Sequence, residues 1–132
     1  MSRILLIETD RLLANAVSEF LTSRGHDIDW QADPQEALSS ADRVKPDAVI
    51  LDLILAAHNG IEFLYEFRSY PDWAGIPIII FSNLTPPELA NLASGLNQLD
   101  IADCHYKPAT SLDQLSQSIE RALRRQPIHE AL

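Results

Sequence analysis

The chain has 132 residues, of which 46% are hydrophobic, so it can form one domain around a buried core. Its formal net charge of −9 argues against non-specific binding to nucleic acid, which depends on Lys and Arg side chains that neutralise phosphates. The single cysteine, Cys104, excludes an intramolecular disulfide and a metal site built from several cysteines. The first apolar run, residues 4–7, is too short for a signal peptide or a membrane span, so we expect a cytoplasmic protein without membrane contact.

Strand and helix patterns alternate along the first half of the chain. Residues 4–7 are wholly apolar, which is typical of a strand covered on both faces. Apolar residues at helical spacing follow at positions 12–21. Residues 28–32 alternate with acidic positions, which indicates a strand at an edge of the sheet. Asp33 then caps a second helix, with a proline at its first position, and that helix is predicted to run to about Val44.

The second half repeats this alternation three more times. The predicted strands span residues 48–51, 78–81 and 103–106. The first of these precedes a helix at residues 61–70, and the other two precede helices that begin at capping sequences, residues 85–88 and 111–114. We expect the last helix to end before Pro127, so the domain should span residues 1–126 and be followed by a tail, 127–132, of no evident structure.

Five consecutive strand–helix units predict an α/β fold. Wholly apolar strands need cover on both faces, so the sheet should be parallel with helices on either side. Right-handed crossovers make this a doubly wound fold. In such sheets ligands bind beyond the carboxyl ends of the strands, where the strand order reverses. The residues that end the strands are therefore the candidates for function.

The polar residues at these strand ends are Glu8, Thr9, Asp10, Asp52, Ser82 and Lys107. Each has a structural explanation, since Asp and Ser often end strands by bonding turn backbones and a lysine at a sheet edge is usually solvated. Together they suit phosphoryl transfer, which needs an oxygen nucleophile, a hard cation and donors for the phosphoryl oxygens. Asp52 supplies a carboxylate nucleophile, and Glu8 with Asp52 supplies oxygen ligands for Mg²⁺. Ser82 and Lys107 supply a hydroxyl and an ammonium group.

The order and spacing of these residues resemble the receiver domain of response regulators in two-component signalling. The resemblance covers about residues 3–125 and rests on three motifs. Residues 46–53 contain Asp52, which Gly60 follows after eight positions; residues 77–82 end on Ser82; and Lys107 precedes a proline through a bond that is usually cis in this family. The resemblance implies the flavodoxin-like (βα)5 fold of chemotaxis receivers, with strand order 2-1-3-4-5.

The resemblance also implies a function. Asp52 would accept a phosphoryl group from a histidine kinase or a phosphotransfer protein, and Ser82 and Lys107 would contact that group. Glu8, Asp52 and the backbone carbonyl of Ile54 would bind Mg²⁺. Such a chain is a regulatory domain rather than an enzyme. We expect it to act as a monomer or weak dimer on a downstream protein, through its last two strand–helix units, without direct contact to nucleic acid.

The sequence departs from the family pattern in the first and last of these units and in the loop after Asp52. Receivers usually carry two adjacent acids after the first strand, whereas the second position here is Thr9. Asp10 comes one residue late and is better placed to cap the first helix, so Thr9 and Asp10 are weaker candidates for metal ligands, and Mg²⁺ binding should be weak. Cys104 stands where receivers often carry an aromatic switch, and we expect it to be buried. His58 is expected in an exposed loop.

Two other interpretations remain open at this stage. The chain could be a degenerate receiver that binds proteins without being phosphorylated. A small enzyme or flavin carrier on the same architecture is a third hypothesis. A flavin phosphate would need a loop rich in Gly, Ser and Thr after the first strand, and residues 8–12 do not form one. An aspartyl phosphatase would want an acid two residues after its nucleophile, where this chain has Ile54.

Overall fold

The computed structural model describes the backbone of residues 2–55 and 59–130, and their side chains except those of residues 93–97 and 125–130. The strands are β1 (Arg3–Ile7), β2 (Asp27–Gln31), β3 (Ala48–Leu51), β4 (Ile78–Ser82) and β5 (Ile101–Tyr106). The helices are α1 (Arg11–Ser23), α2 (Pro34–Arg43), α3 (Gly60–Ser69), α4 (Pro86–Leu96) and α5 (Leu112–Glu130). Short 3-10 turns lie at Pro71–Trp73, Asn97–Leu99 and Lys107–Ala109.

The five strands form one parallel sheet in the order β2-β1-β3-β4-β5. The α/β class, the doubly wound topology and the strand order predicted from the sequence are therefore confirmed. The alternating strand, β2, lies at an edge of the sheet, as its pattern predicted.

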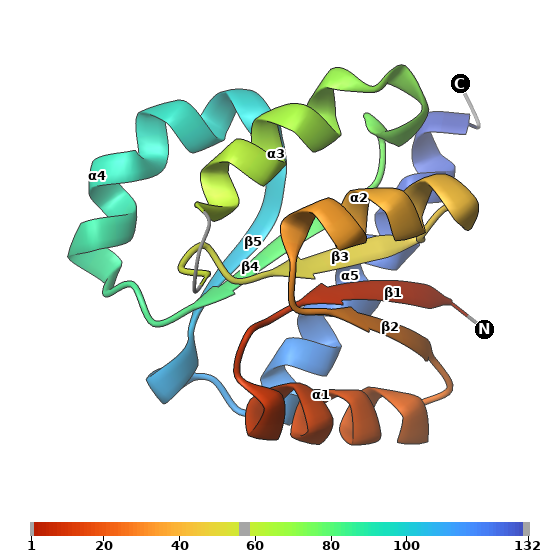
Figure 1. The fold of residues 1–132 in the computed structure, drawn as a ribbon, viewed down its shortest axis with the longest axis horizontal. Coiled ribbons are helices and arrows are strands. Elements are labelled where there is room, and N and C mark those ends of the chain that lie inside the picture. The colour runs from red at the N-terminus through yellow and green to blue at the C-terminus, as the bar shows by residue number, and fades with distance from the viewer. Residues whose placement is uncertain (1, 56–58, 131–132) are drawn as a thin grey trace.

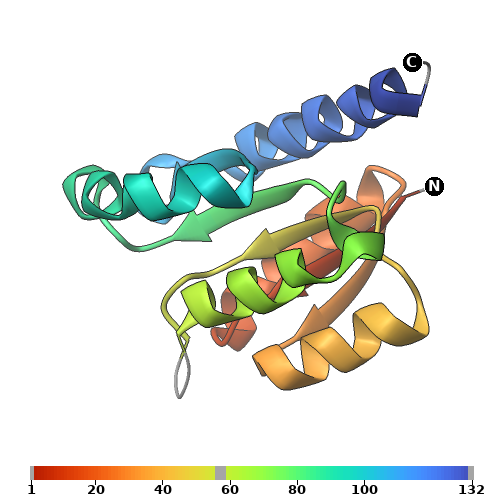
Figure 2. The same ribbon diagram turned by 90° about the horizontal axis from the view of Figure 1, so that it is seen from above.

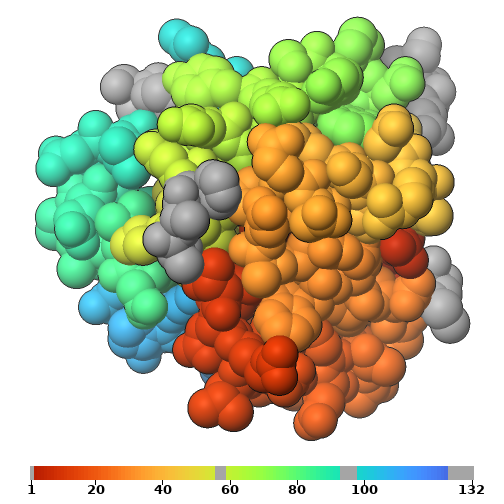
Figure 3. Space-filling model, in the orientation of Figure 1, coloured from red at the N-terminus to blue at the C-terminus, as the bar shows by residue number. Residues whose placement is uncertain are grey.

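Helices cover both faces of the sheet, as Figure 1 shows. Buried side chains of α2 and α3 pack with Leu5, Ile7, Val49, Leu51 and Ile80 on one face, which α4 also covers. Buried side chains of α1 and α5 pack with Ile4, Leu6, Ile50, Ile79 and Phe81 on the other. Alternate residues of β1, β3 and β4 thus enter opposite cores, which explains why these strands are apolar at every position. In the space-filling view, α2 and α3 form a continuous surface over the first core (Figure 3).

The helices begin at the capping residues that the sequence predicted. Asp33 accepts a hydrogen bond from the amide of Gln35 at the start of α2. Thr85, just before α4, and Glu88, in its first turn, exchange hydrogen bonds of 2.8 Å and 3.3 Å. Since such caps satisfy amides that have no partner inside the helix, they fix where each helix starts.

Two expectations about the C-terminal region are wrong. Helix α5 ends at Glu130, so the backbone of residues 127–130 is helical and not a tail without structure. A proline inside a helix removes one backbone hydrogen bond and crowds the carbonyl four residues before it, but a helix can still continue past it. The described backbone contains no cis peptide bond, so the bond between Lys107 and Pro108 is trans. The domain boundary at residue 126 stays a prediction.

The carboxyl ends of the strands meet at one end of the molecule. Figure 2 shows β3 and β4 pointing away from the end at which both chain termini lie. The strand-end residues singled out from the sequence therefore lie opposite the termini.

Candidate functional site

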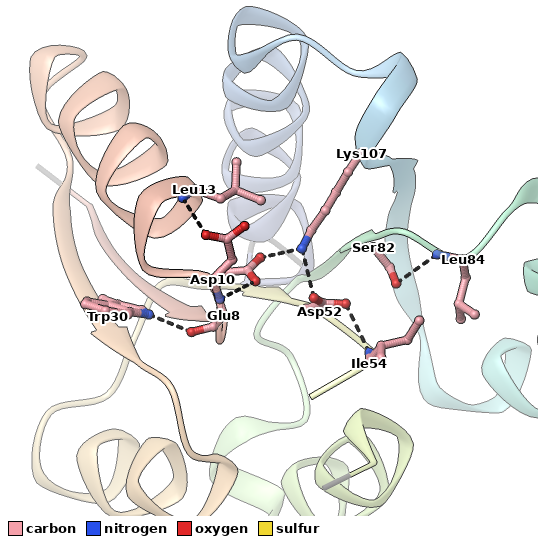
Figure 4. A network of polar contacts seen from close by, with 9 residues as sticks. All are labelled: Glu8, Asp10, Leu13, Trp30, Asp52, Ile54, Ser82, Leu84 and Lys107. Carbon is pink, nitrogen blue, oxygen red and sulfur yellow. Dashed lines mark hydrogen bonds and ion pairs between the residues drawn. The ribbon is translucent and has the colours of Figure 1, made fainter. Parts of the chain in front are cut away.

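A lysine bridges two buried carboxylates at the carboxyl end of the sheet (Figure 4). The ammonium Nζ of Lys107 lies 2.7 Å from Oε1 of Glu8 and 2.8 Å from Oδ2 of Asp52. Glu8 and Asp52 are only 2% and 5% exposed. Since buried charges are costly unless they are paired, the three groups stabilise one another only while all three hold this geometry.

The position of Asp52 is fixed by its own strand and by the turn that follows. Its backbone amide donates to the carbonyl of Ile7 on β1, at 3.1 Å. Its second carboxylate oxygen, Oδ1, accepts a hydrogen bond from the amide of Ile54, at 3.0 Å. One oxygen of the carboxylate thus faces the ammonium of Lys107 and the other faces the turn.

Glu8 is held at four points. Its amide donates to the carbonyl of Gln31 on β2, at 3.1 Å, and its carbonyl accepts a hydrogen bond from the indole Nε1 of Trp30, at 2.7 Å. In the side chain, Oε2 accepts from the amide of Asp10, at 3.1 Å, while Oε1 pairs with Lys107. Hydrogen bonds therefore orient the backbone of Glu8, and a hydrogen bond and an ion pair orient its carboxylate.

Burial alone would lower the pKa of Lys107. Hydrogen bonds to Asp52 and Glu8, and the charges of these two carboxylates, outweigh that effect and raise the pKa above its ordinary value. The ammonium is consequently charged at neutral pH, and the cluster of two carboxylates and one ammonium carries a formal charge of −1.

Ser82 ends the neighbouring strand β4 and is fully buried. Its hydroxyl oxygen accepts a hydrogen bond from the amide of Leu84, at 3.3 Å. Figure 4 shows the hydroxyl near Asp52, at the same end of the sheet. The structure therefore places Glu8, Asp52, Ser82 and Lys107 in one region, as their positions after the strands predicted.

The weaker candidates for metal ligands are placed differently. Asp10 is exposed, and its side chain accepts a hydrogen bond from the amide of Leu13 at the start of α1, at 3.2 Å. It therefore caps the helix, as the sequence favoured. Thr9 is half-buried beside it, and Ile54, whose carbonyl was a candidate, has an exposed side chain. Across the described part of the chain no three His, Cys, Asp or Glu residues are grouped to hold a metal ion.

Cys104 and His58 are two further positions at which the sequence departs from the family pattern. Cys104 is exposed on β5, so the expectation that it is buried is wrong. It pairs with Ile80 on β4, but β5 is the last strand of the sheet, where a side chain has neighbours on one side only. His58 lies outside the described residues.

Sequence reasoning missed Trp30 and the role of Gly60 in shaping the site. A tryptophan near the end of a polar edge strand was the available signal, because a half-buried indole N–H needs an acceptor. A side-chain β-carbon at Gly60 would lie 2.7 Å from the Cα of Leu53 and 2.8 Å from the carbonyl oxygen of Asp52. Helix α3 can begin this close to Asp52 only because residue 60 has no side chain.

The family model of the response regulator receiver domain matches residues 4–120, which include the whole ion-paired cluster. The chain belongs to this family. Receiver domains of response regulators are regulatory, and they partner with histidine kinases in two-component systems. In the part of this receiver that the structure describes, none of the helices combines the length and apolar composition needed to cross a membrane.

Curated relatives match over much of the receiver. The transcriptional regulatory protein QseB of Haemophilus influenzae is 36% identical over 80 residues, which cover 61% of this chain and 35% of QseB. The transcriptional regulatory protein TcrA of Mycobacterium tuberculosis is 28% identical over 126 residues, 96% of this chain and 47% of TcrA. The receiver thus spans less than half the length of these two relatives.

Solved structures share the fold over nearly the whole chain. A two-component response regulator from Clostridium difficile superposes with a TM-score of 0.82 at 25% identity and covers 95% of this chain and 98% of its own. The chemotaxis protein CheY4 of Vibrio cholerae has a TM-score of 0.82 at 23% identity and covers 92% of this chain and 98% of its own.

Proposed function

We propose that this receiver takes a phosphoryl group from a histidine kinase, or from a phosphotransfer protein, onto Asp52. The observation that carries the proposal is the pairing of Lys107 with both Glu8 and Asp52, at 2.7 Å and 2.8 Å. It combines a carboxylate nucleophile with a fixed cation at the end of the sheet where ligands of doubly wound folds bind.

In the proposed reaction an oxygen of the Asp52 carboxylate forms a bond to phosphorus while the bond from phosphorus to the donor imidazole nitrogen breaks. The electron pair of the breaking bond stays on that nitrogen, and Asp52 becomes an acyl phosphate. Lys107 is already within ion-pair distance of Asp52, so it can pair with a phosphoryl oxygen after a small movement. Ser82 offers a hydroxyl donor to a second oxygen.

The donor set fits a magnesium ion that keeps several waters. Mg²⁺ is commonly bound through one or two carboxylates plus phosphate oxygens, and Glu8 and Asp52 are two buried carboxylates with a net excess of one negative charge over Lys107. Glu8, Asp52 and the carbonyl of Ile54 would hold the ion. When bound, it would neutralise charge on the phosphoryl oxygens. Because one ammonium already neutralises half of the carboxylate charge, binding should be weak.

Phosphorylation is tested with acetyl phosphate and Mg²⁺ on the full chain, followed by intact-mass measurement. We expect a single labile phosphoryl adduct on the wild type and on Asp72→Asn, an exposed control outside the site. The adduct should be absent from Asp52→Asn. An adduct that survives the Asp52→Asn substitution would show that another residue is the acceptor.

We also propose that the signal leaves through protein contact on the last two βα units, from β4 to α5. The net charge of −9 supports protein contact over duplex DNA. The alternative of a receiver that works without phosphorylation has no support among the described residues, since the acceptor, the lysine and the hydroxyl lie together. Salt-sensitive, specific binding of duplex DNA by the purified chain would contradict the proposal of protein contact.

A further inference from the structure

We propose that Trp30 is a positioning residue for the phosphoryl site: its indole N–H, through the carbonyl of Glu8, holds Glu8 so that its carboxylate meets Lys107. This inference rests on the proposed function for its consequence, cation and phosphoryl binding. Its structural part, the orientation of Glu8 and Lys107, holds whether or not the chain is phosphorylated.

The carbonyl of Glu8 needs a donor that the sheet does not supply. The register of β1 with β2 pairs Leu6 with Trp30 and Ile7 with Gln31, where β2 ends. The amide of Glu8 still reaches the carbonyl of Gln31, but no further strand residue of β2 can serve the Glu8 carbonyl. The indole Nε1 of Trp30 takes that place at 2.7 Å, a short distance for a hydrogen bond from nitrogen. A side chain thus extends the pairing of the edge strand by one residue.

The indole is itself held in place. Trp30 is half-buried and packs against the core between the sheet and helices α1 and α5. A rotation of its ring would leave the indole N–H and the Glu8 carbonyl without their partners, which is unfavourable for groups shielded from water. Figure 4 shows the ring on one side of Glu8 and Lys107 on the other. The hydrogen bond therefore fixes Glu8 from the edge of the sheet.

The hydrogen bond from Trp30 matters because of where the Glu8 side chain lies. Glu8 is 2% exposed, and a shift of its backbone would move a buried carboxylate away from Lys107. The next residue, Thr9, is neutral, so Glu8 is the only acid at the end of β1 whose side chain faces Lys107 in the described cluster. Misplacing Glu8 would leave Asp52 as the sole carboxylate partner of the ammonium.

The chain allows a direct test because it has two tryptophans and two lysines. Trp73 lies in the core on the opposite face of the sheet, stacked on Phe67 at 4.8 Å. Trp73→Phe is therefore the matched control for Trp30→Phe. Lys45 is exposed and provides an internal reference for the side-chain signals of Lys107.

The measurement is the position of the side-chain Cε and Nζ NMR signals of the two lysines at a fixed neutral pH, in the full chain without metal. In Trp30→Phe the Lys107 signals should shift, because the ammonium loses its contact with Glu8, while the Lys45 signals should not change. In Trp73→Phe the signals of both lysines should stay as in the wild type. Replacement of Trp30 by benzothienylalanine, in the Trp73→Phe background, keeps the bicyclic shape and puts a sulfur that cannot donate in place of the N–H. This isostere should give the same shift for Lys107, which separates the hydrogen bond from packing.

Cation binding gives the second readout. We expect Mg²⁺ to bind ~10-fold more weakly to Trp30→Phe than to the wild type, by analogy with the loss of other outer partners of metal ligands. The indole N–H signal of Trp30 should shift with Mg²⁺ and that of Trp73 should not. If the wild type binds no Mg²⁺ and forms no phosphoryl adduct, the proposed function fails, while the Lys107 signals at fixed pH still decide the role of Trp30. Lys107 signals that are unchanged in both Trp30 variants would overturn the inference.

Discussion

The ammonium Nζ of Lys107 lies 2.8 Å from Oδ2 of Asp52, although 55 residues separate the two in the chain. The contact joins the ends of β5 and β3, which are not neighbours in the sheet because β4 lies between them. Glu8 reaches the same ammonium from β1. A single cation after β5 therefore partly neutralises two carboxylates that β1 and β3 bring together. Its removal should affect the stability of the fold as well as the site.

Lys107→Met should destabilise the chain by about 3 kcal/mol at neutral pH, since it leaves two buried carboxylates without their partner. Urea denaturation at neutral pH measures the loss. Lys45→Met is the control and should be close to neutral. Equal losses for the two variants would contradict the importance of the buried pairs.

The raised pKa of Lys107 sets the upper pH limit of the stability that its ion pairs contribute. A group whose pKa is raised by folding contributes stability that is complete below its unfolded pKa and is lost as the pH rises through its folded pKa. The advantage of the wild type over Lys107→Met should therefore persist to about pH 10.4, the ordinary pKa of lysine, and shrink above it.

Gly60→Ala should destabilise the chain by about 2 kcal/mol and slow phosphorylation of Asp52. The added methyl group would meet the backbone of Leu53 and Asp52 at 2.7 Å and 2.8 Å, and backbone atoms there cannot give way without moving the site. Gly75→Ala is the matched control, since nothing lies within 4 Å of the added group. Urea midpoints and rates with acetyl phosphate measure the two effects. Comparable behaviour of the two variants would contradict a special role for Gly60.

Much of the fold could be predicted from the sequence because it depends on local patterns. Wholly apolar strands such as residues 48–51 require two covered faces, and capping sequences such as residues 85–88 mark helix starts. The grouping of Asp52 with Lys107 followed from a general rule about strand ends in parallel sheets. The strand order itself came from the resemblance, since periodicity alone does not specify which strands pair.

The contacts that the sequence did not reveal are those set by tertiary geometry. The hydrogen bond from Trp30 to Glu8 depends on where β2 ends relative to β1, which is a matter of register. The exposure of Cys104 depends on its place in the last strand of the sheet. Pro127 predicts a helix end, yet α5 continues to Glu130, so the rest of the helix outweighs the lost hydrogen bond and the crowding that a proline brings.

Arg68→Lys should destabilise the chain by about 2 kcal/mol, because a lysine cannot reproduce the fork of a guanidinium. Arg68 lies in the last turn of α3, and it donates to four carbonyl oxygens, those of Trp73, Ala74, Leu99 and Asp100, at 2.8–3.1 Å. It thus joins the segments before β4 and β5. Urea denaturation measures the loss, and Arg43→Lys on the exposed end of α2 should change little. A loss no larger than that of Arg43→Lys would show that these hydrogen bonds are replaced by water.

Ser118→Ala should raise the pKa of Asp103. Burial alone would raise that pKa, but the hydroxyl of Ser118, the nearby His105 and other donors outweigh it and hold the pKa below its ordinary value. A carboxyl whose pKa is lowered by folding adds stability above its unfolded pKa, and this stability is lost as the pH falls through the folded value. The variant should therefore lose less stability than the wild type on acidification below about pH 4. Carbon NMR of the Asp103 carboxyl and urea midpoints test this, with Ser39→Ala as the exposed control.

Thr9→Asp should tighten Mg²⁺ binding by at least ~10-fold, because a carboxylate offers the ion a charged oxygen where threonine offers a neutral hydroxyl. Among the side chains that the structure describes, the buried acids are Glu8 and Asp52, both already paired with Lys107, while Asp10 is engaged as the cap of α1. The third acid should raise the formal charge of the cluster from −1 to −2. Without metal, Thr9→Asp should consequently be less stable than the wild type.

Calorimetric titration of Mg²⁺ and urea denaturation with and without Mg²⁺ decide the matter. Thr9→Asp should regain stability with Mg²⁺ as its tighter binding requires, and it should form the acyl phosphate faster than the wild type. Thr9→Ala is the control and should change neither quantity appreciably, since it removes only a neutral oxygen. If the wild type already binds Mg²⁺ as tightly as Thr9→Asp, the argument from the missing acid is wrong. Asp10→Asn would then show whether Asp10 leaves the helix cap to bind the ion.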